Sequence, residues 1–380
     1  MRAKNRKITK WLSPFRLLFH SFFVSLNMIL AILFIVSAFS DRISPVKSVF
    51  FAYLGLVFPL LFWINVIFLI YWIITRKWLY VVILAVVFLF CRIPIANYYP
   101  IHPETKNLPE ENMIKVLSYN VMSFAYKDHT EESPNKIIEY IAQSGADIVC
   151  LQEYMVSTRD NLMSSRDVAN ALNMYPYIVE ISFSPETNTR YKYGLAVLSK
   201  YPISKSKRIK INSTYNGAAI HEINVKGRKI LLVNNHLESF KLTAEDRSKY
   251  SDAITNMSIE TLDGLRGTIQ QKLGHAFKVR AQQAQQIATE INQQKHSYTL
   301  VCGDFNDTPV SYCHRTMQGN LSDAYADTGF GPGISYNQNF FFFRIDNIFH
   351  SPNLEAYNCR VDRSVKISDH YPIYCYFRVL

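Results

Sequence analysis

Acidic side chains are almost absent from the first 100 residues of this 380-residue chain. The whole chain has 41 Lys and Arg residues and 30 Asp and Glu residues. The first 100 residues contain 11 of the basic residues and one acid, Asp41, so the rest of the chain has 30 basic and 29 acidic residues. The net charge of +11 therefore belongs to the N-terminal end. The larger part is nearly neutral, which argues against a strongly basic nucleic-acid-binding surface and relates the charge to membrane topology.

The six cysteines have no CxxC spacing and form no dense framework. This pattern gives no support to a cysteine zinc site or a disulfide scaffold. Cys150 and Cys302 lie inside apolar runs, so we expect both to be small buried hydrophobic residues. The sequence also lacks internal repeats and low-complexity tracts, which argues against a repeat architecture.

Long apolar runs dominate residues 1–99. The first covers residues 17–39, the second residues 49–74, and a shorter third covers residues 78–90 and can extend to Ala96. Because a spanning helix needs about 20 apolar residues, the sequence predicts three transmembrane helices. A signal peptide would explain the first run, but two more runs follow it and no clear small-residue cleavage site does.

Basic residues flank these runs asymmetrically. Six precede the first run and two separate the second from the third: Arg2, Lys4, Arg6, Lys7, Lys10 and Arg16, then Arg76 and Lys77. The positive-inside rule places both groups in the cytoplasm. With three crossings, the sequence predicts a multi-pass protein of the cell membrane whose remaining domain is extracytoplasmic, periplasmic or extracellular. If the third run does not cross, that domain lies on the cytoplasmic side.

Prolines mark the boundary after the membrane region. Pro100, Pro103 and Pro109 predict an extended linker at residues 100–112, which leaves residues 113–380 as a separate folded domain. Short apolar runs there predict strands at 114–119, 146–151, 195–198, 220–225, 230–233, 299–302, 345–349 and 373–379. Helices are predicted between Ser133 and Gly145 and over residues 277–291. Residues 240–275 are polar and indicate no element.

Polar side chains follow or precede several of these strands. They occur in six short runs: Ser118-Tyr119-Asn120, Leu151-Gln152-Glu153, Asn235-His236-Leu237, Cys302-Gly303-Asp304-Phe305-Asn306, Arg344-Ile345-Asp346 and Ser368-Asp369-His370. Each run alone has an ordinary explanation, such as a turn for Asn120, a helix cap for Glu153, a core histidine for His236 or a cross-strand ion pair for Arg344 and Asp346. Six such runs at strand ends together indicate one site.

Metal-assisted cleavage of a phosphate ester requires oxygen ligands and an oriented water. Glu153 and Asp369 are the candidate ligands for Mg²⁺, or for Mn²⁺, because these hard cations bind oxygen. Asp304 and Asn306 are separated by one residue, so on an extended chain both point to the same side and can hold one water.

The remaining polar residues complete this chemistry. His370 can contact the phosphate while Asp346 holds its tautomer. His236 is a second candidate acid or phosphate contact. Asn120 can orient the Glu153 carboxylate or touch the phosphate.

In this order the motifs resemble the endonuclease/exonuclease/phosphatase superfamily, which includes DNase I-like nucleases, exonuclease III-like repair enzymes, neutral sphingomyelinases and inositol polyphosphate 5-phosphatases. The resemblance covers about residues 113–380 and implies Mg²⁺ dependence and a four-layer α/β sandwich, with two mixed β-sheets flanked by helices. It implies the following roles: metal binding for Glu153 and Asp369, water orientation for Asp304 and Asn306, phosphate binding for His370, its partner acid at Asp346, and the first-motif and HL-motif positions for Asn120 and His236.

The sequence departs from the exonuclease III-like pattern at one position. Those members carry an acid two residues after the first-motif asparagine, where this chain has Met122. The departure and the membrane region argue against abasic-site repair, and the arrangement resembles the anchored family members common in bacteria.

These observations predict a membrane-anchored, Mg²⁺-dependent phosphoesterase. An anchored site within reach of lipid headgroups and a near-neutral domain favour a lipid or small phosphoester over nucleic acid. One alternative is an extracytoplasmic endonuclease or exonuclease. A second is an inactive, membrane-tethered domain that only binds a ligand or partner. The bilayer is the expected partner, and the sequence indicates no protein partner.

Overall fold

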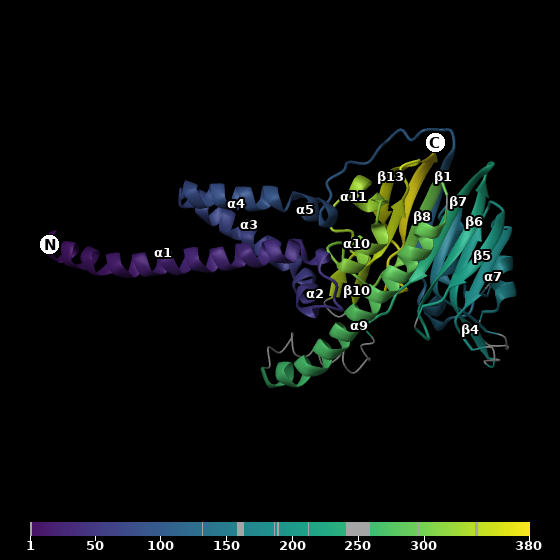
Figure 1. Ribbon diagram of the computed structural model, residues 1–380, viewed down its shortest axis with the longest axis horizontal. Helices are drawn as coiled ribbons and strands as arrows, with labels where there is room; N and C mark the ends of the chain where they lie inside the picture. The colour runs from purple at the N-terminus through teal and green to yellow at the C-terminus, as the bar shows by residue number, and fades with distance from the viewer. Residues whose placement is uncertain are drawn as a thin grey trace.

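The computed structural model describes residues 2–130, 132–157, 163–185, 187, 190–211, 213–240, 259–294, 296–338 and 341–380. A group of N-terminal helices projects from one side of an α/β domain that contains the rest of the described chain (Figure 1). Residues 241–258, which belong to the polar segment without a predicted element, lie outside the described residues. The remainder of that segment forms the start of a long helix, α9 (Ile259–Gln293).

The N-terminal region contains one long helix and two bent helix pairs. These are α1 (Arg2–Ala38), α2 (Val49–Leu56) with α3 (Phe58–Ile74), and α4 (Trp78–Phe90) with α5 (Arg92–Tyr98). In α1, Phe15–Ala38 is a 24-residue segment long and apolar enough to cross a membrane. The pairs bend by 55° and 66°, so each is long enough to span only if its two helices together form one broken span.

Polar side chains connect the helices inside this apolar region. Asn27 Nδ2 donates to Asn65 Oδ1 at 3.4 Å, and Trp72 Nε1 donates to Asn27 Oδ1 at 2.9 Å. All three side chains are buried, and such contacts stabilise helix pairs in an apolar surrounding. They join α1 to α3.

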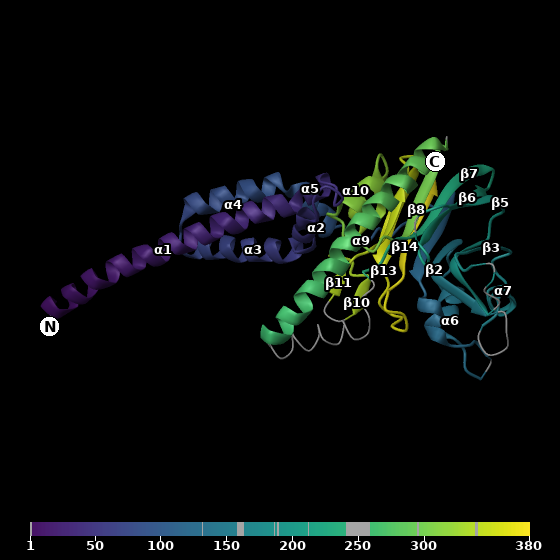
Figure 2. The same cartoon turned by 60° about the horizontal axis from the view of Figure 1, so that its bottom comes forward.

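The N-terminal helices pack directly against the α/β domain. Ser40 Oγ, in the 3₁₀ turn η1 (Ser40–Arg42), donates to Val310 O at 3.0 Å. The Tyr53 hydroxyl donates to Gln270 O in α9, and its ring meets Phe277 with centroids 5.4 Å apart. Figures 1 and 2 both place α2 beside the α/β domain, so the helices are joined to it by more than the linker.

The α/β domain contains two six-stranded mixed sheets. In the first, the strand order is β13 (Leu354–Val361), β14 (Ile373–Val379), β1 (Met113–Asn120), β2 (Ile148–Ser157), β4 (Tyr191–Ser199), β3 (Tyr177–Ser182). In the second it is β5 (Ile203–Ile209), β6 (Gly217–Val225), β7 (Arg228–His236), β8 (Tyr298–Asp304), β12 (Asp346–His350), β9 (Ser322–Asp323). The pairs β1–β2 and β7–β8 are parallel, and the other pairs are antiparallel.

Buried side chains from both sheets form the central core. Val116 of β1 and Leu232 of β7 belong to the same fully buried cluster. A second cluster packs α6 (Lys136–Gln143) and α7 (Ser165–Ala171) on the outer face of the first sheet. A third packs α9 and α10 (Tyr312–Gln318) on the second sheet. The predicted four-layer sandwich, with two mixed sheets flanked by helices, is confirmed.

The remaining elements are short: η2 (Met122–Tyr126), α11 (Ala324–Thr328) and the two-stranded sheet of β10 (Tyr336–Gln338) and β11 (Phe341–Phe343). Every predicted strand is present, and the predicted turn at Lys226 and Gly227 joins β6 to β7. All six cysteines are free and buried, as expected for Cys150 and Cys302.

A buried ion cluster joins the last strands to the N-terminal helices. Arg344 Nη1 lies 3.0 Å from Asp323 Oδ2, which is also 3.1 Å from His314 Nε2, and Arg344 Nη2 donates to the carbonyl of Asn97 in the last turn of α5. Burial opposes ionisation of Asp323, but Arg344 and His314 outweigh it and hold the pKa of this carboxyl well below its usual range. A carboxyl whose pKa is depressed on folding stabilises the folded state. This contribution is fully present at pH values above the unfolded-state pKa, near 3.9, and is lost as the pH falls through the folded-state pKa.

We expect Asp323→Asn to lower the free energy of unfolding by about 3 kcal/mol at pH 7, because it leaves the Arg344 charge buried without its partner. Urea unfolding of the full chain in detergent measures the change. Asp327→Asn is the matched control, since Asp327 is half exposed. Equal stabilities for the two variants would contradict this role for the cluster.

Candidate active site

Six strand ends and loops meet at one edge of the sandwich. Parallel neighbours run in the same direction in a sheet, so Asn120 at the end of β1 lies beside Gln152 in β2, and His236 at the end of β7 lies beside Asp304 at the end of β8. A pocket of about 350 Å³ opens there, lined by Met122, Tyr126, Glu153, His236, Ser239, Phe240, Asp304, Asn306, Tyr336, Phe343, Ile345, Asp369 and His370. Of the predicted site residues, Asn120 and Asp346 lie directly behind this lining.

A bulge in β2 places Glu153. The pairing of β2 with β4 shifts register between Leu151 and Tyr154, and Glu153 has a φ of +50°. A bulge re-aims one side chain within a strand that otherwise alternates between two faces. Here Gln152 remains fully buried, while Glu153 lines the pocket with 27% of its side chain exposed.

Asn120 connects the two sheets at the site. Its Nδ2 donates to Glu153 Oε1 and to Asp304 Oδ2, both at 3.1 Å. Its own carbonyl accepts a hydrogen bond from Ser368 Oγ at 2.7 Å. Asn120 is fully buried, so these contacts fix two carboxylates from different sheets in one arrangement.

Close packing of β8 against β7 places Asp304. Gly303 has a φ of +138°, and a Cβ there would lie 1.9 Å from the Asn235 carbonyl oxygen, so glycine is needed for this approach. The chain then turns so that the Asn306 backbone N–H donates to Asp304 Oδ1 at 2.8 Å and Asn306 Nδ2 donates to Asp304 Oδ2 at 3.2 Å. Asp304 and Asn306 therefore contact each other directly, on a turn rather than on the extended chain expected from the sequence.

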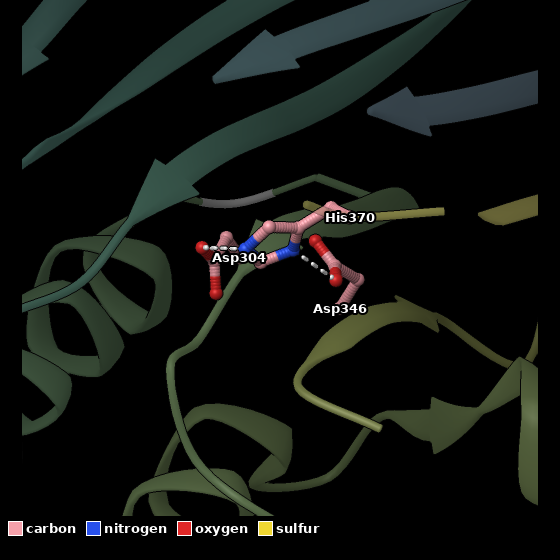
Figure 3. Close-up of side chains that lie close together, drawn as sticks. All are labelled: Asp304, Asp346 and His370. Atoms are coloured by element: carbon pink, nitrogen blue, oxygen red, sulfur yellow. Dashed lines mark hydrogen bonds and ion pairs between the residues drawn. The ribbon is translucent and has the colours of Figure 1, made fainter. Parts of the chain in front are cut away.

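His370 lies between two carboxylates (Figure 3). Its Nδ1 donates to Asp346 Oδ2 at 2.8 Å, and its Nε2 lies 3.6 Å from Asp304 Oδ2. Ser335 Oγ accepts from the backbone N–H of Asp346 at 3.1 Å and supports that end of the pair. Burial alone lowers the pKa of His370, but the Asp346 and Asp304 carboxylates outweigh it and raise the pKa well above its ordinary value. The two carboxylates therefore favour the protonated form of His370.

His236 has the opposite tendency. Its Nε2 lies 3.6 Å from Asp304 Oδ2 and 3.8 Å from Glu153 Oε1. Burial dominates and lowers its pKa, although the Asp304 carboxylate opposes this effect. The pKa values of the two histidines are thus shifted in opposite directions, as is common where acid and base roles are divided.

Burial also raises the pKa of Asp304, to about 6, while the His370 cation opposes the change. A carboxylate with a pKa near neutrality accepts a proton more readily than one with an ordinary pKa, which is near 3.9. The side chain is 1% exposed and lies at the centre of the site.

A left-handed turn forms one wall of the pocket. The five residues of η2 all have φ between +45° and +56°. This conformation is unfavourable for non-glycine residues, by roughly 1–2 kcal/mol each. Buried Phe124 and hydrogen bonds from Asn135 Nδ2 to the carbonyls of Phe124 and Lys127 hold the turn. Met122 and Tyr126 therefore face the pocket, and Met122 is the residue that stands where the exonuclease III-like pattern has an acid.

Several pocket residues were not among the predicted site residues: Tyr126, Ser239, Phe240, Tyr336, Phe343 and Ile345. Most lie in loops or short strands outside the recognised motifs. Only Ile345 was within a motif, between Arg344 and Asp346, and Ser239 and Phe240 directly follow the Asn235-His236-Leu237 run. A search for apolar residues adjoining the polar motifs would have found Phe240, Ile345 and also Phe343, which directly precedes Arg344, whereas Tyr336 lies eight residues before the nearest motif.

Oxygen ligands for a cation lie beside the histidines. Among the described residues, Asp304, Asp346 and His370 form the group whose potential ligand atoms all lie within 4.8 Å of one another. The ring of His370, however, is already hydrogen-bonded to Asp346, and its two nitrogens face different carboxylates, so we interpret this group as a hydrogen-bonded chain. The carboxylates of Glu153 and Asp369 line the same pocket and supply the donors that suit a hard divalent cation.

Comparison with solved structures finds similar folds at low sequence identity. An endonuclease/exonuclease/phosphatase from Beutenbergia cavernae DSM 12333 is 15% identical, with a TM-score of 0.49 and coverage of 71% of this chain and 72% of that chain. One from Bacteroides vulgatus is 18% identical, with a TM-score of 0.49 and coverage of 71% and 100%. Sphingomyelinase C from Streptomyces griseocarneus is 18% identical, with a TM-score of 0.44 and coverage of 69% and 98%. No curated protein matches the chain.

Two family models match separate parts of the sequence. A domain of unknown function matches residues 20–98, and the endonuclease/exonuclease/phosphatase family matches residues 117–370, about two thirds of the chain. The second match includes every residue predicted for the site. The chain therefore belongs to the endonuclease/exonuclease/phosphatase family, whose members are metal-dependent hydrolases of phosphoric ester bonds.

Proposed function

We propose that this chain is a membrane-anchored, Mg²⁺-dependent phosphoesterase that hydrolyses a lipid or another small phosphoester. The observation that carries the proposal is the pocket at the strand ends, where Asp304 and His370, whose protonated form is favoured, lie 3.6 Å apart beside Glu153 and Asp369. A base, a cation for phosphoryl oxygens and a set of oxygen ligands are thus within reach of one ester.

Asp304 is the proposed base. Its carboxylate accepts the proton of a water that attacks the phosphorus in line with the leaving oxygen, and Asn306 and Asn120 keep the carboxylate in place. His370, held by Asp346, contacts the negatively charged phosphoryl oxygens. His236 Nε2 lies 3.6 Å from Asp304 Oδ2, and in the neutral ring its N–H can donate a hydrogen bond to the departing oxygen.

Glu153 and Asp369 would hold the metal ion. Their carboxylates fit Mg²⁺, and Mn²⁺ accepts the same ligands. A bound divalent cation supplies positive charge to the phosphoryl oxygens as the ester bond breaks. Asn120 keeps Glu153 oriented through the hydrogen bond to Oε1.

The lining of the pocket favours a small or lipid ester over a nucleic acid. None of the described residues that line it is Lys or Arg, whereas several are apolar or aromatic, among them Met122, Phe240 and Phe343. A nuclease gains most of its affinity from cations along the phosphate backbone. Apolar walls instead suit the hydrocarbon next to a lipid headgroup.

The proposed location follows from the helices. If α1 and both bent pairs cross the bilayer, the domain lies on the side opposite the basic N-terminus, which is the extracytoplasmic side by the positive-inside rule. The β10–β11 sheet, which supplies Tyr336 and Phe343 to the pocket, lies on the part of the α/β domain nearest those helices (Figures 1 and 2). The bilayer surface is thus close to the pocket wall.

A substrate panel tests this function. Purified full-length protein should hydrolyse phospholipid or sphingolipid phosphoesters in mixed micelles at least tenfold faster than plasmid DNA, at equal phosphoester concentration and with Mg²⁺. Inositol phosphates in the panel separate a soluble substrate from a lipid one. Faster cleavage of DNA would support the nuclease alternative. No hydrolysis, together with no metal binding that depends on Glu153, would support the inactive binding domain.

A further inference from the structure

A second polar cavity lies between the N-terminal helices and the α/β domain. Its volume is about 460 Å³, and its lining shares no residue with the active-site pocket: Arg42, Ile43, Ser44, Val46, Lys47, Gln282, Gln285 and Tyr312. The first five lie in the segment between α1 and α2, and the others lie on α9 and α10. In Figure 1 the end of α1 and α2 lie against the domain next to α10.

The cavity adjoins the expected edge of the bilayer. The apolar segment Phe15–Ala38 ends four residues before Arg42, and α2 begins two residues after Lys47. Residues at this level meet lipid headgroups when α1 spans a membrane. Basic residues directly beside a spanning helix are a common means of binding anionic headgroups.

The cavity carries an excess of positive charge. Arg42 and Lys47 are exposed, and no acidic side chain of the described residues lies within 4.0 Å of either cation. The neighbouring acid, Asp41, is already paired with Arg315 of α10 at 3.1 Å. Arg42 packs its guanidinium over the ring of Phe39, 4.7 Å from the centroid, which holds it at the end of the apolar segment.

Neutral donors complete the lining. Gln285 Nε2 donates to the Tyr312 hydroxyl oxygen at 2.7 Å, which leaves the Tyr312 O–H free to donate to a ligand. An adjoining cavity of about 650 Å³ continues along α9. It shares Gln282 and Gln285 with the first and adds Lys210 to the lining. Its acid, Glu290, is paired with Lys207 at 2.8 Å. The surface thus combines the cations of Arg42 and Lys47, with Lys210 nearby, and the hydroxyl and amide donors of Tyr312 and the glutamines. Such a combination suits phosphate oxygens.

We propose that this cavity binds the phosphate of an anionic membrane lipid, separately from the active site. Arg42 and Lys47 supply the charge, and Tyr312 and the two glutamines supply hydrogen bonds. The bound headgroup fixes the α/β domain on the bilayer surface through α9 and α10. The proposal rests on Phe15–Ala38 lying in a bilayer and does not depend on the substrate of the active site.

The test measures thermal unfolding of the full chain in zwitterionic phosphatidylcholine nanodiscs with and without added phosphatidylglycerol. We expect phosphatidylglycerol to raise Tm by about 2–4 °C in the unsubstituted protein, because binding to the folded state stabilises it. The double variant Arg42→Gln/Lys47→Gln should lose this shift. Lys226→Gln/Arg228→Gln, on the β6–β7 turn, removes the same two charges outside the cavity and should retain it.

Inorganic phosphate provides the second arm. If free phosphate in lipid-free detergent reproduces the whole shift, the cavity takes a soluble anion and the assignment to lipid is wrong. An equal phosphatidylglycerol shift in both double variants overturns the site itself. Hydrolysis of a soluble phosphodiester should be unchanged by Arg42→Gln/Lys47→Gln, so failure here is distinguishable from failure of the proposed enzyme function.

Discussion

Asp304→Asn is expected to reduce kcat for phosphoester hydrolysis by roughly 10²–10⁴-fold, the usual contribution of a positioned general base. The substitution keeps the shape of a side chain that is 1% exposed, and its amide oxygen can still accept from Asn120 Nδ2. It removes the carboxylate that takes the proton from water, so kcat should fall far more than KM rises. Steady-state hydrolysis of a chromogenic phosphodiester with saturating Mg²⁺ measures the effect.

Asp327→Asn is a matched control for this variant, because it makes the same chemical change in α11 at a half-exposed position outside the pocket. It should keep wild-type kcat. Equal Tm values for the two variants and the unsubstituted protein would exclude loss of folding as the cause. An undiminished kcat in Asp304→Asn would rule out Asp304 as the base.

Glu153→Gln should have the second large effect, on metal dependence. Replacing a charged ligand by a neutral one weakens Mg²⁺ binding, and even the loss of an outer hydrogen-bond partner typically reduces metal affinity 10–100-fold. We expect the Mg²⁺ concentration for half-maximal activity to rise at least tenfold, with partial recovery of rate at high Mg²⁺. A titration of activity against Mg²⁺ measures this shift.

The control for Glu153→Gln is Glu355→Gln, an exposed acid on β13 that lies outside the pocket. Its Mg²⁺ dependence should match that of the unsubstituted protein. If Glu153→Gln has the same half-maximal Mg²⁺ concentration as this control, Glu153 is not a metal ligand and the proposed metal site is wrong.

Much of the fold could be predicted from local signals. Alternating or continuous apolar runs identified the central strands, and Lys226-Gly227 identified the β6–β7 hairpin, because these features depend on residues close in sequence. The edge strands β3, β5 and β13 were not predicted. In β5 the exposed basic residues Lys205 and Lys207 interrupt the apolar pattern, whereas β3 and β13 are mostly half-buried and show no clear alternation of buried and exposed residues.

The helix α9 shows a different limit. The spacing of apolar residues predicted only residues 277–291, whereas the helix begins at Ile259. Its first half carries two glycines, Gly264 and Gly267, and many polar residues, which favour neither a helix nor a loop strongly. Contacts distant in sequence, such as Tyr53 with Gln270, support this part of α9 and cannot be seen in its local sequence.

The polar members of the site could be identified because each lies at or near the end of a predicted strand, although β2 in fact continues past Glu153 to Ser157. The structure brings all eight of them to one pocket or its immediate surroundings. The sequence could not reveal the geometry. The bulge at Glu153, the left-handed turn at Met122 and the sharp turn at Asn306 depend on pairing and packing with distant segments. The aromatic wall from Phe240, Tyr336 and Phe343 likewise exists only in the folded chain.

Removal and restoration of the metal tests the central claim most directly. Purified full-length protein is stripped with EDTA, dialysed, and assayed on a chromogenic phosphodiester before and after addition of Mg²⁺. We predict that hydrolysis is lost on stripping and restored by Mg²⁺ in the unsubstituted protein, while Asp304→Asn stays inactive throughout. Two results would contradict a metal-dependent phosphoesterase centred on Asp304. One is hydrolysis by the unsubstituted protein that continues undiminished after stripping, and the other is equal recovery of hydrolysis on addition of Mg²⁺ in Asp304→Asn and the unsubstituted protein.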